Sequence, residues 1–339
     1  MKKFLFPLLI FTIAITDCRP QSGQKFAEIG SLRLESGGTI LNCKIGYRTY
    51  GKLNVAKDNA VLFTAWFSGT TEQLSGIIGG NDKPLDSTKY YIITVDALGN
   101  GVSSSPSNSA EQPDSLFPVF NIRDMVESQY ILLTKHLGIN HLKAIYGGSM
   151  GAMQGMQWLV SYPEFMDKAA LYVGTPKASS YDLLFWQERL NAIKLAHKYN
   201  MPDSELIRII APLELITGRT PEYFIENLKE EDVQKNLNWF YGLFKNSFDS
   251  YNWEYQLKAM VLHDVSKPFG SMEKAAASVK ADVYIIVSKD DHTVRPEPAI
   301  KFAKMINAKL WVIENNCGHL APSCEGDKYV KAVREFLEE

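Results

Sequence analysis

The stretch Leu-Lys-Ala-Ile-Tyr-Gly-Gly-Ser-Met-Gly-Ala-Met-Gln, residues 142–154, decides the fold. Its first five residues form a mostly apolar run typical of a short buried strand, and a helical pattern begins at Met150. Ser149, the serine of the Gly-x-Ser-x-Gly spacing, therefore lies at a turn from strand to helix. Glycines two residues before and after the serine let the helix approach the strand closely. A turn this sharp presents the Ser149 hydroxyl above the sheet, in the position of a nucleophile.

Short apolar runs alternate with helical segments on both sides of this stretch. Two strands are expected near the start, around a Ser-Gly-Gly turn at residues 36–38. The alternation implies an α/β protein whose mostly parallel central sheet has helices on both faces. The predicted strands are 31–35, 40–50, 60–66, 90–95, 142–146, 169–173, 283–287 and 310–313, and the main predicted helices are 122–137, 150–161 and 325–337.

Residues 179–268 interrupt this alternation. They are rich in aromatic residues, have helical periodicity and contain no predicted strand, which favours a helical cap inserted over the carboxyl edge of the sheet. The expected organisation is a leader at residues 1–18, a core formed by 25–178 and 269–339, and the cap between the two parts of the core.

Composition excludes several other classes of protein. The chain has 339 residues, of which 45% are hydrophobic and 22% charged, as in soluble globular proteins. Its net charge is -2 and no basic run occurs, so we expect no nucleic-acid partner.

A serine nucleophile needs a base to take its proton, and the base needs a carboxylate to orient it. On a sheet with this turn, the acid and then the histidine follow the serine in the chain. His319, just after the last predicted strand, is the expected base. Asp291, three residues before Val294, is the expected acid, with Asp290 as the alternative. His292 is expected to be an ordinary loop histidine.

Two backbone N–H groups should hold the oxyanion that forms when the serine attacks a carbonyl. The amide of Met150 is one candidate, and that of Phe67, in the loop after the strand ending at residue 66, is the other. The side chain of Phe67 is also expected to pack against the cap. No His-Glu-x-x-His motif occurs, so we expect no metal or resident cofactor.

The chain begins like an export signal. A basic segment at residues 1–3 precedes an apolar run of 12 residues, 4–15, which is shorter than the ~20 that span a membrane. Cys18 then stands where a bacterial lipoprotein would be lipidated, although Asp17 departs from that pattern. The expected location is the cell envelope, lipid-anchored through Cys18 or else soluble after ordinary cleavage. A buried amino-terminal strand or helix is the remaining possibility.

Export would permit disulfides, and Cys317 and Cys324 lie on one short loop. We therefore hypothesise a bridge between them. The other cysteines are Cys18 and Cys43, and their spacings match no zinc site.

Several segments resemble the homoserine O-acetyltransferase branch of the α/β-hydrolases. They are Asn-Ile-Arg-Asp-Met-Val with a following Gln at 121–129, Leu-Gly-Ile at 137–139, the serine turn through Gln154, and Trp158. Residues 99–106 and 117–118 also look like that branch, and the late segments look like α/β-hydrolases in general. The resemblance implies the α/β-hydrolase fold, a triad at Ser149, Asp291 and His319, and an acyl-enzyme intermediate.

Three departures from that branch bear on the acyl acceptor. The family's His-Ala-Leu-Thr oxyanion loop is Ala-Trp-Phe-Ser at 65–68, and the helix after 186–189 lacks the usual Asp-Pro continuation. The family's metabolic members are cytoplasmic, whereas this chain carries an export signal and acetyl-CoA is scarce outside the cytoplasm. We therefore expect an esterase that acts on small-molecule acyl esters, with water as the acceptor.

Two alternatives stay open. One is an acyltransferase that moves an acyl group to homoserine or another small alcohol, for which acetyl-CoA would be the donor. An arginine placed to bind the carboxylate of an amino acid would favour the acyltransferase, and Arg189 and Arg219 are the candidates. The other is an inactive surface-binding lipoprotein that uses the cap for contacts with a partner. The oligomeric state is left open.

Overall fold

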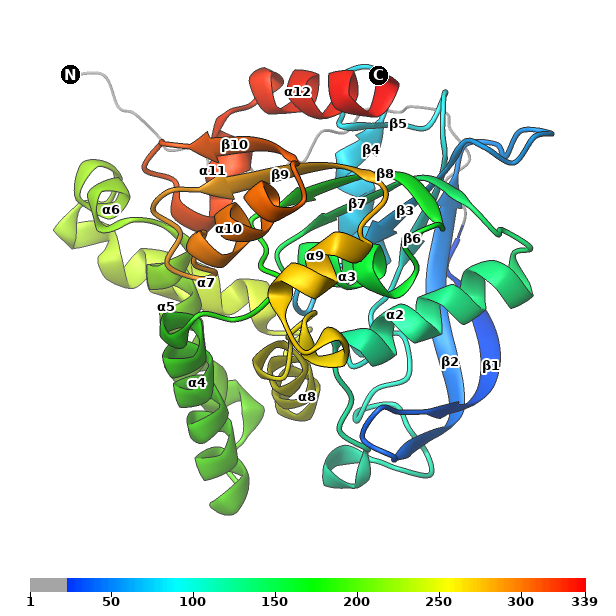
Figure 1. Cartoon of the computed structure of the whole chain (residues 1–339). Helices are drawn as coiled ribbons and strands as arrows, with labels where there is room; N and C mark the ends of the chain where they lie inside the picture. Colours follow the sequence, from blue (N-terminus) through cyan, green and yellow to red (C-terminus); the bar gives the residue numbers. More distant parts are fainter. Residues whose placement is uncertain (1–22) are drawn as a thin grey trace.

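Eight strands form one sheet through the centre of the computed structural model, which describes residues 23–339 (Figure 1). Their order is β1-β2-β6-β3-β7-β8-β9-β10; β1, β2 and β6 pair antiparallel, and all pairs from β6 to β10 are parallel. The predicted mostly parallel sheet is confirmed. The strands are β1 (Lys25–Arg33), β2 (Thr39–Tyr50), β3 (Ala60–Thr64), β6 (Tyr91–Val95), β7 (Leu142–Gly148), β8 (Met166–Tyr172), β9 (Asp282–Ser288) and β10 (Lys309–Ile313).

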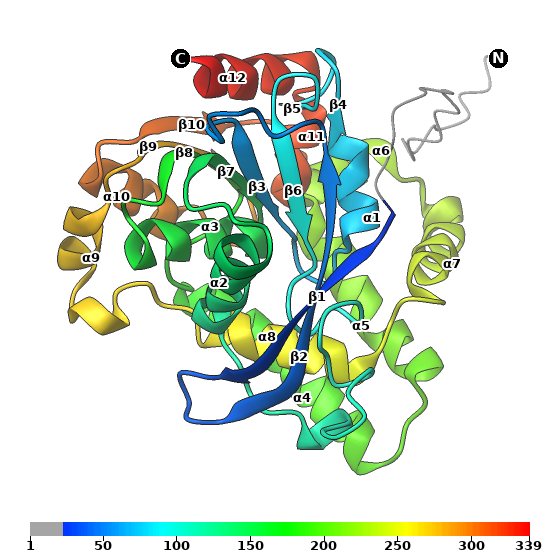
Figure 2. The ribbon, with the colours of Figure 1, turned by 90° about the vertical axis from the view of Figure 1, so that its right-hand side faces the viewer.

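Helices cover both faces of the sheet. In the edge-on view of Figure 2, α2, α3, α9 and α10 lie on one face, and α1 and α11 on the other. Within residues 23–339, no helix has both the length and the apolar character needed to cross a membrane. These helices and the carboxyl-terminal one are α1 (Thr71–Leu74), α2 (Ile122–Ile131), α3 (Met150–Ser161), α9 (Met272–Ser278), α10 (Glu297–Met305), α11 (Ala321–Cys324) and α12 (Asp327–Glu338).

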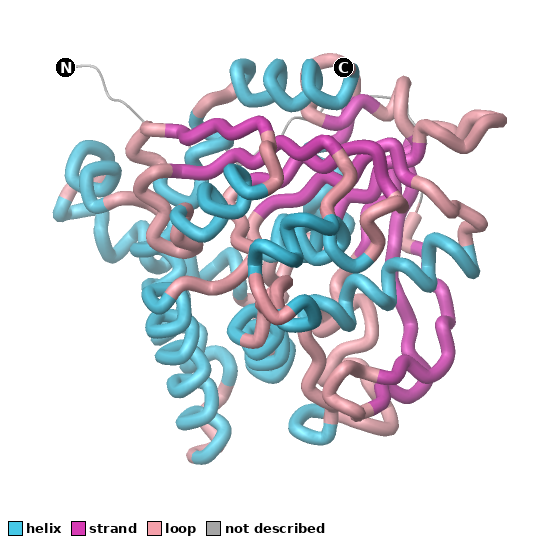
Figure 3. The backbone as a smooth tube through the Cα atoms, viewed as in Figure 1, coloured by secondary structure: helices cyan, strands magenta, loops and turns pink. Residues whose placement is uncertain are grey.

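A group of five further helices comes between β8 and α9 in the chain and lies together beside the sheet (Figures 1 and 3). Gln256 of this group hydrogen-bonds to the loops that follow β3 and β6, so the group contacts the carboxyl ends of those strands. An antiparallel bridge between Lys177 and Asp264 joins the segment before the first of these helices to the segment after the last. The helices are α4 (Ser180–Lys198), α5 (Asp203–Gly218), α6 (Pro221–Asn227), α7 (Val233–Phe244) and α8 (Ser250–Val261).

Several elements differ from the sequence-based expectation. The first strand, predicted for 31–35, starts earlier and spans Lys25–Arg33. The strand predicted for 60–66 ends at Thr64, because the next residues enter a turn in which Gly69 N donates to Trp66 O at 2.9 Å. The helix predicted for 122–137 changes at Leu132 into a π-helical turn that ends at His136. A separate parallel pair, β4 (Ile78–Gly79) and β5 (Leu85–Asp86), is too short to leave a pattern in the sequence.

Helix α3 lies directly on β3. A Cβ atom added to Gly151 would lie 2.4 Å from the backbone oxygen of Thr64, and one added to Gly147 would lie 2.4 Å from Thr64 Oγ1. The two elements are also joined by a hydrogen bond from Thr64 Oγ1 to Gly151 O at 2.8 Å. Glycine is therefore required at both positions, because any side chain would push the helix off the strand.

Gly151→Ala is expected to lower the free energy of unfolding by about 1–3 kcal/mol, because the added methyl group must displace backbone atoms. Gly242→Ala is the control: Gly242 lies exposed in α7 with open space around it, so alanine should raise the free energy of unfolding by up to about 1 kcal/mol. Urea unfolding followed by tryptophan fluorescence measures both variants. Wild-type stability in Gly151→Ala would contradict the close contact of α3 with β3.

Candidate active site

Ser149 lies between β7 and α3 with a backbone conformation that side chains rarely adopt. Its φ is 55° and its ψ is -124°, and its amide donates to Tyr172 O at 2.9 Å. A residue other than glycine at such angles costs about 1–3 kcal/mol and persists only where its surroundings enforce it. The contact between α3 and β3 supplies that enforcement.

The imidazole of His319 contacts this serine. His319 lies in the short helix η6 (Gly318–Leu320) after β10, and its Nε2 is 2.9 Å from Ser149 Oγ. Gly318 has a left-handed φ of 59°, and a Cβ atom there would lie 2.9 Å from the Cα of Arg219. Glycine thus lets the loop that carries His319 pack against the turn between α5 and α6.

The carboxylate of Asp291 contacts the other side of the imidazole. Its Oδ2 is 2.7 Å from His319 Nδ1, and its Oδ1 accepts the amides of Thr293 and Val294 at 2.8 and 2.9 Å. Because a carboxylate only accepts hydrogen bonds, Nδ1 of the neutral imidazole carries the proton. Nε2 is then the acceptor for the Ser149 hydroxyl.

The side chains of Asp290 and His292, on either side of Asp291 in the chain, have other surroundings. Asp290 is exposed, whereas Asp291 is buried. The ring of His292 contacts that of Tyr181, with the centroids 6.5 Å apart. The structure thus brings Ser149, His319 and Asp291 together and leaves Asp290 at the surface.

Charged groups around Asp291 fix its loop. Arg295 Nη1 donates to Asp291 O at 2.9 Å, and the carboxylate of Glu297 raises the pKa of Arg295. The Arg295 amide donates to Asp182 Oδ1 at 2.9 Å, which ties the loop to the start of α4. Burial, together with the nearby charge of Asp291, raises the pKa of Asp182.

The turn at residues 66–69 carries the second predicted oxyanion donor. In this turn Ser68 has a left-handed φ of 55°, and its amide donates to Gln256 Oε1 at 2.8 Å. Within residues 23–339 the amides of Phe67 and Met150 donate no hydrogen bond, which leaves both free for a ligand. The Phe67 ring packs against Trp253 of α8 with the centroids 4.9 Å apart.

Two glutamines that sequence reasoning gave no role hold this turn. Gln154 of α3 donates to Ala65 O at 2.9 Å, and Gln256 of α8 accepts from Ser68. Gln154 could have been found from its position, since it is a polar residue on a buried face one turn after Met150. Gln256 lies between apolar residues of an aromatic-rich helix and carries no such signal.

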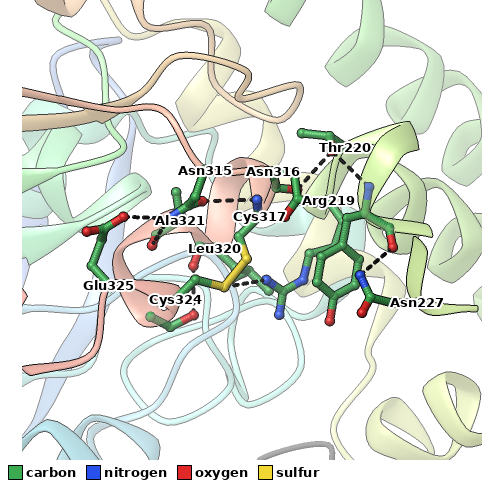
Figure 4. Close-up of a disulfide and its surroundings, with 12 residues drawn as sticks. Arg219, Thr220, Asn227, Asn315, Asn316, Cys317, Leu320, Ala321, Cys324 and Glu325 are labelled. Carbon is green, nitrogen blue, oxygen red and sulfur yellow. Dashed lines mark hydrogen bonds between the residues drawn. A yellow bond between two sulfur atoms is a disulfide. The ribbon is translucent and has the colours of Figure 1, made fainter. Parts of the chain in front are cut away.

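A disulfide between Cys317 and Cys324 closes the loop that contains His319 (Figure 4). The hypothesised bridge is therefore present. Arg219 Nη1 lies 3.3 Å from Cys324 Sγ, and the guanidinium stacks over the ring of Tyr223 at 4.5 Å. Burial lowers the pKa of Arg219. Thr220 Oγ1 donates to Asn316 O at 2.8 Å, so the loop is fixed from the α6 side as well.

Arg189, the other arginine singled out, already has a carboxylate partner. It lies on α4 with 1% of its surface exposed, forms an ion pair with Glu214 of α5, and stacks over Phe185 at 4.2 Å. In the part of the chain that the structure describes, no three His, Cys, Asp or Glu side chains gather to hold a metal ion.

Comparison with known proteins agrees with this architecture. Residues 75–323 match the family described as alpha/beta hydrolase fold. The chain is 32% identical to an ethyl acetate hydrolase of Pseudomonas veronii over 86% of this chain and 88% of that protein. It is 32% identical to a homoserine O-acetyltransferase of Nautilia profundicola over 78% of this chain and 83% of that protein. The solved structure of the acetyl esterase MekB superposes with a TM-score of 0.88 at 30% identity, covering 94% of this chain and 97% of that one.

These matches span most of the chain, and they include both esterases and acetyltransferases on one fold. They agree with the resemblance carried by the serine turn and the segment at residues 121–129. The chain is therefore an enzyme of the α/β-hydrolase family, an esterase or acyltransferase of the branch that contains the homoserine O-acetyltransferases.

Proposed function

We propose that the chain is an exported serine esterase that hydrolyses small acyl esters. The observation that carries the proposal is the hydrogen-bonded series from Ser149 through His319 to Asp291. His319 Nε2 takes the hydroxyl proton while Ser149 Oγ attacks the ester carbonyl. The same proton then goes to the leaving alcohol. Water, deprotonated by His319, releases the acid and restores the serine.

The free amides of Phe67 and Met150 hold the oxyanion in both steps. Charge develops on the carbonyl oxygen only in the tetrahedral state, so fixed N–H donors there lower the barrier more than they tighten substrate binding. The start of α3 adds the positive end of its helix dipole, since Met150 is its first residue.

Water is favoured over an amino-acid alcohol as the acceptor. An acceptor such as homoserine carries a carboxylate that a free arginine would bind. Arg189 is buried in an ion pair with Glu214, and the Arg219 guanidinium contacts Cys324 and Tyr223. Transfer to a small alcohol with acetyl-CoA as the donor is the second candidate, because a homoserine O-acetyltransferase is among the relatives.

Short acyl groups are the proposed substrates. The relatives include an ethyl acetate hydrolase and an acetyl esterase, and both names indicate an acetyl group. We extend that preference to this chain, with a small alcohol as the leaving group.

Export is part of the proposal. The signal at residues 1–18 lies outside the described residues, so its support is the sequence itself. The disulfide beside His319 adds to it, because structural disulfides persist in oxidising compartments and are rare in the cytosol. We propose attachment to the membrane through lipidated Cys18.

Ser149→Ala is expected to lower kcat/KM for p-nitrophenyl acetate by at least about a thousandfold, because it removes the nucleophile. Purified residues 19–339 are assayed with and without homoserine. An unchanged rate of acetate release when homoserine is added supports the esterase. Formation of O-acetylhomoserine with a matching loss of free acetate supports the transferase. Release of p-nitrophenol at only the uncatalysed rate by both the wild type and Ser149→Ala would contradict both and favour the inactive binding protein.

Ser250→Ala is the matched control for this experiment. Ser250 Oγ lies 2.9 Å from His197 Nε2, and His197 Nδ1 lies 3.2 Å from Glu254 Oε2, so it repeats the serine–histidine–carboxylate pattern. It is the first residue of α8, however, and is buried without the strained backbone of Ser149. Ser250→Ala should keep wild-type activity.

Reducing the Cys317–Cys324 disulfide should lower esterase activity several-fold and the free energy of unfolding by about 2–3 kcal/mol, since it closes a loop of eight residues. Activity and urea unfolding are measured with and without dithiothreitol. The Cys317→Ser/Cys324→Ser double variant should match the reduced wild type and be insensitive to dithiothreitol. Buried Cys43, whose pKa burial raises to about 12, stays unreactive in the folded protein. An unchanged kcat after reduction would show that the bridge does not position His319.

Cys18→Ala is expected to abolish incorporation of radiolabelled palmitate into the full chain expressed in a bacterial host and to release the protein from the membrane fraction. Lipidation requires the thiol of that residue. Cys43→Ala, which changes a buried residue of β2, serves as the control. Loss of the leader without lipid incorporation in the wild type would favour the soluble exported form.

A further inference from the structure

Two buried glutamines from distant parts of the chain hold the turn that presents the Phe67 amide. Gln154 on α3 is fully buried and Gln256 on α8 is 1% exposed. Each uses both ends of its side-chain amide, and each reaches a backbone group within two residues of Phe67.

Gln154 links the two elements that carry the proposed oxyanion donors. Its Nε2 donates to Ala65 O at 2.9 Å, on the loop after β3, and to Met150 O at 3.1 Å, on α3. Its Oε1 accepts from Gln129 Nε2 at 2.6 Å, and Gln129 Oε1 accepts from Trp158 Nε1 at 2.8 Å. An indole N–H only donates, so Trp158 fixes the orientation of both glutamine amides. Gln154 therefore has no alternative but to donate to the two carbonyl groups.

Gln256 acts on the other side of the same turn. Its Oε1 accepts from the Ser68 amide at 2.8 Å, and its Nε2 donates to Leu98 O at 3.0 Å, on the loop after β6. The bond stabilises the left-handed conformation of Ser68, which is unfavourable for a residue with a side chain. It also occupies the Ser68 N–H. Of the two central amides of the turn, only that of Phe67 is left for a ligand.

We propose that Gln154 and Gln256 are positioning residues that set the direction of the Phe67 amide and its distance from the Met150 amide. This inference rests on the proposed function, because it assigns the two amides to the oxyanion. Without Gln154, Ala65 O loses its donor and the link to α3 is broken. Without Gln256, Ser68 relaxes toward an ordinary conformation and turns the Phe67 amide with it.

A purely structural role predicts a different pattern from a positioning role. Loss of the buried hydrogen bonds, three for Gln154 and two for Gln256, lowers stability in either case. Only misplacement of an oxyanion donor lowers kcat while leaving KM nearly unchanged, because the donor acts mainly in the tetrahedral state. The kcat and KM values are therefore compared at equal folded fraction.

The test uses Gln154→Met, Gln256→Met and the matched control Gln157→Met in residues 19–339. Gln157 lies on the same helix as Gln154, is also buried, and donates to Ser161 Oγ at 2.8 Å without reaching the turn. For p-nitrophenyl acetate we expect the first two variants to lower kcat about tenfold to a hundredfold with KM within about twofold. Gln157→Met should change kcat by less than about twofold.

A second readout separates this inference from the proposed function. Diethyl p-nitrophenyl phosphate labels a reactive serine: Ser149 Oγ bonds to phosphorus, p-nitrophenolate leaves, and His319 takes the hydroxyl proton. The phosphoryl oxygen occupies the oxyanion position, so the labelling rate depends on the two amides even in an enzyme that does not turn over acetate esters. Gln154→Met and Gln256→Met should slow labelling by the same factor by which they lower kcat.

The outcomes are distinct. Slower labelling in the two variants, with Gln157→Met unaffected, supports the positioning role. Equal labelling rates in Gln154→Met, Gln157→Met and the wild type overturn the positioning role of Gln154. Equal rates in Gln256→Met, Gln157→Met and the wild type overturn that of Gln256. Each residue is therefore tested even if the other variant fails to fold. Wild-type labelling at Ser149 without ester turnover would contradict the proposed esterase while leaving the positioning role to be decided by the rates.

Discussion

The close contact between α3 and β3 is the constraint on which the rest of the site depends. Thr64 and Gly151 meet with no room for a side chain, and a hydrogen bond joins them. This contact makes the chain reverse within one residue after β7, which forces the strained backbone of Ser149. It also brings the first turns of α3 to the loop after β3, so that Gln154 of the helix can reach Ala65. One packing contact thus orients the proposed nucleophile and brings Gln154 within reach of the loop that carries the Phe67 amide.

Strain at Ser149 also separates it from a second serine that has similar partners. Ser250 contacts His197, which in turn contacts Glu254, yet this serine begins an ordinary helix and is buried. Ser250 has no positive φ, and the amides of Ser250 and Asn252 already donate to the carboxylates of Asp203 and Asp249. Hydrogen-bond partners alone therefore do not define a nucleophile in this fold; backbone geometry and the adjacent N–H groups are needed as well.

Sequence reasoning reached the parts of the structure that follow from local pattern. The strand before Ser149, the helix after it and the position of His319 beyond the last strand are all short-range features, and the structure agrees with each. The sequence favoured Asp291 over Asp290 only by its spacing from Val294. Tertiary structure decides between them, because it buries Asp291 against His319 and leaves Asp290 exposed. The pairs Gln256–Ser68 and Arg189–Glu214 were beyond prediction, since tertiary packing brings them together and neither residue departs from its local pattern.

The hydrogen bond between Gln256 and Ser68 has a consequence for the timing of catalysis. It ties a helix that lies over the carboxyl ends of the strands to the loop that carries a proposed oxyanion donor. If α8 moved away to admit a bulky substrate, the Phe67 amide would lose its orientation at the same moment. The enzyme would then be inactive while open and become competent again only when α8 returned. Under that coupling, the return of α8 would both test the size of the substrate and restore the orientation of the Phe67 amide. An ester too large to let α8 return would be bound without being cleaved.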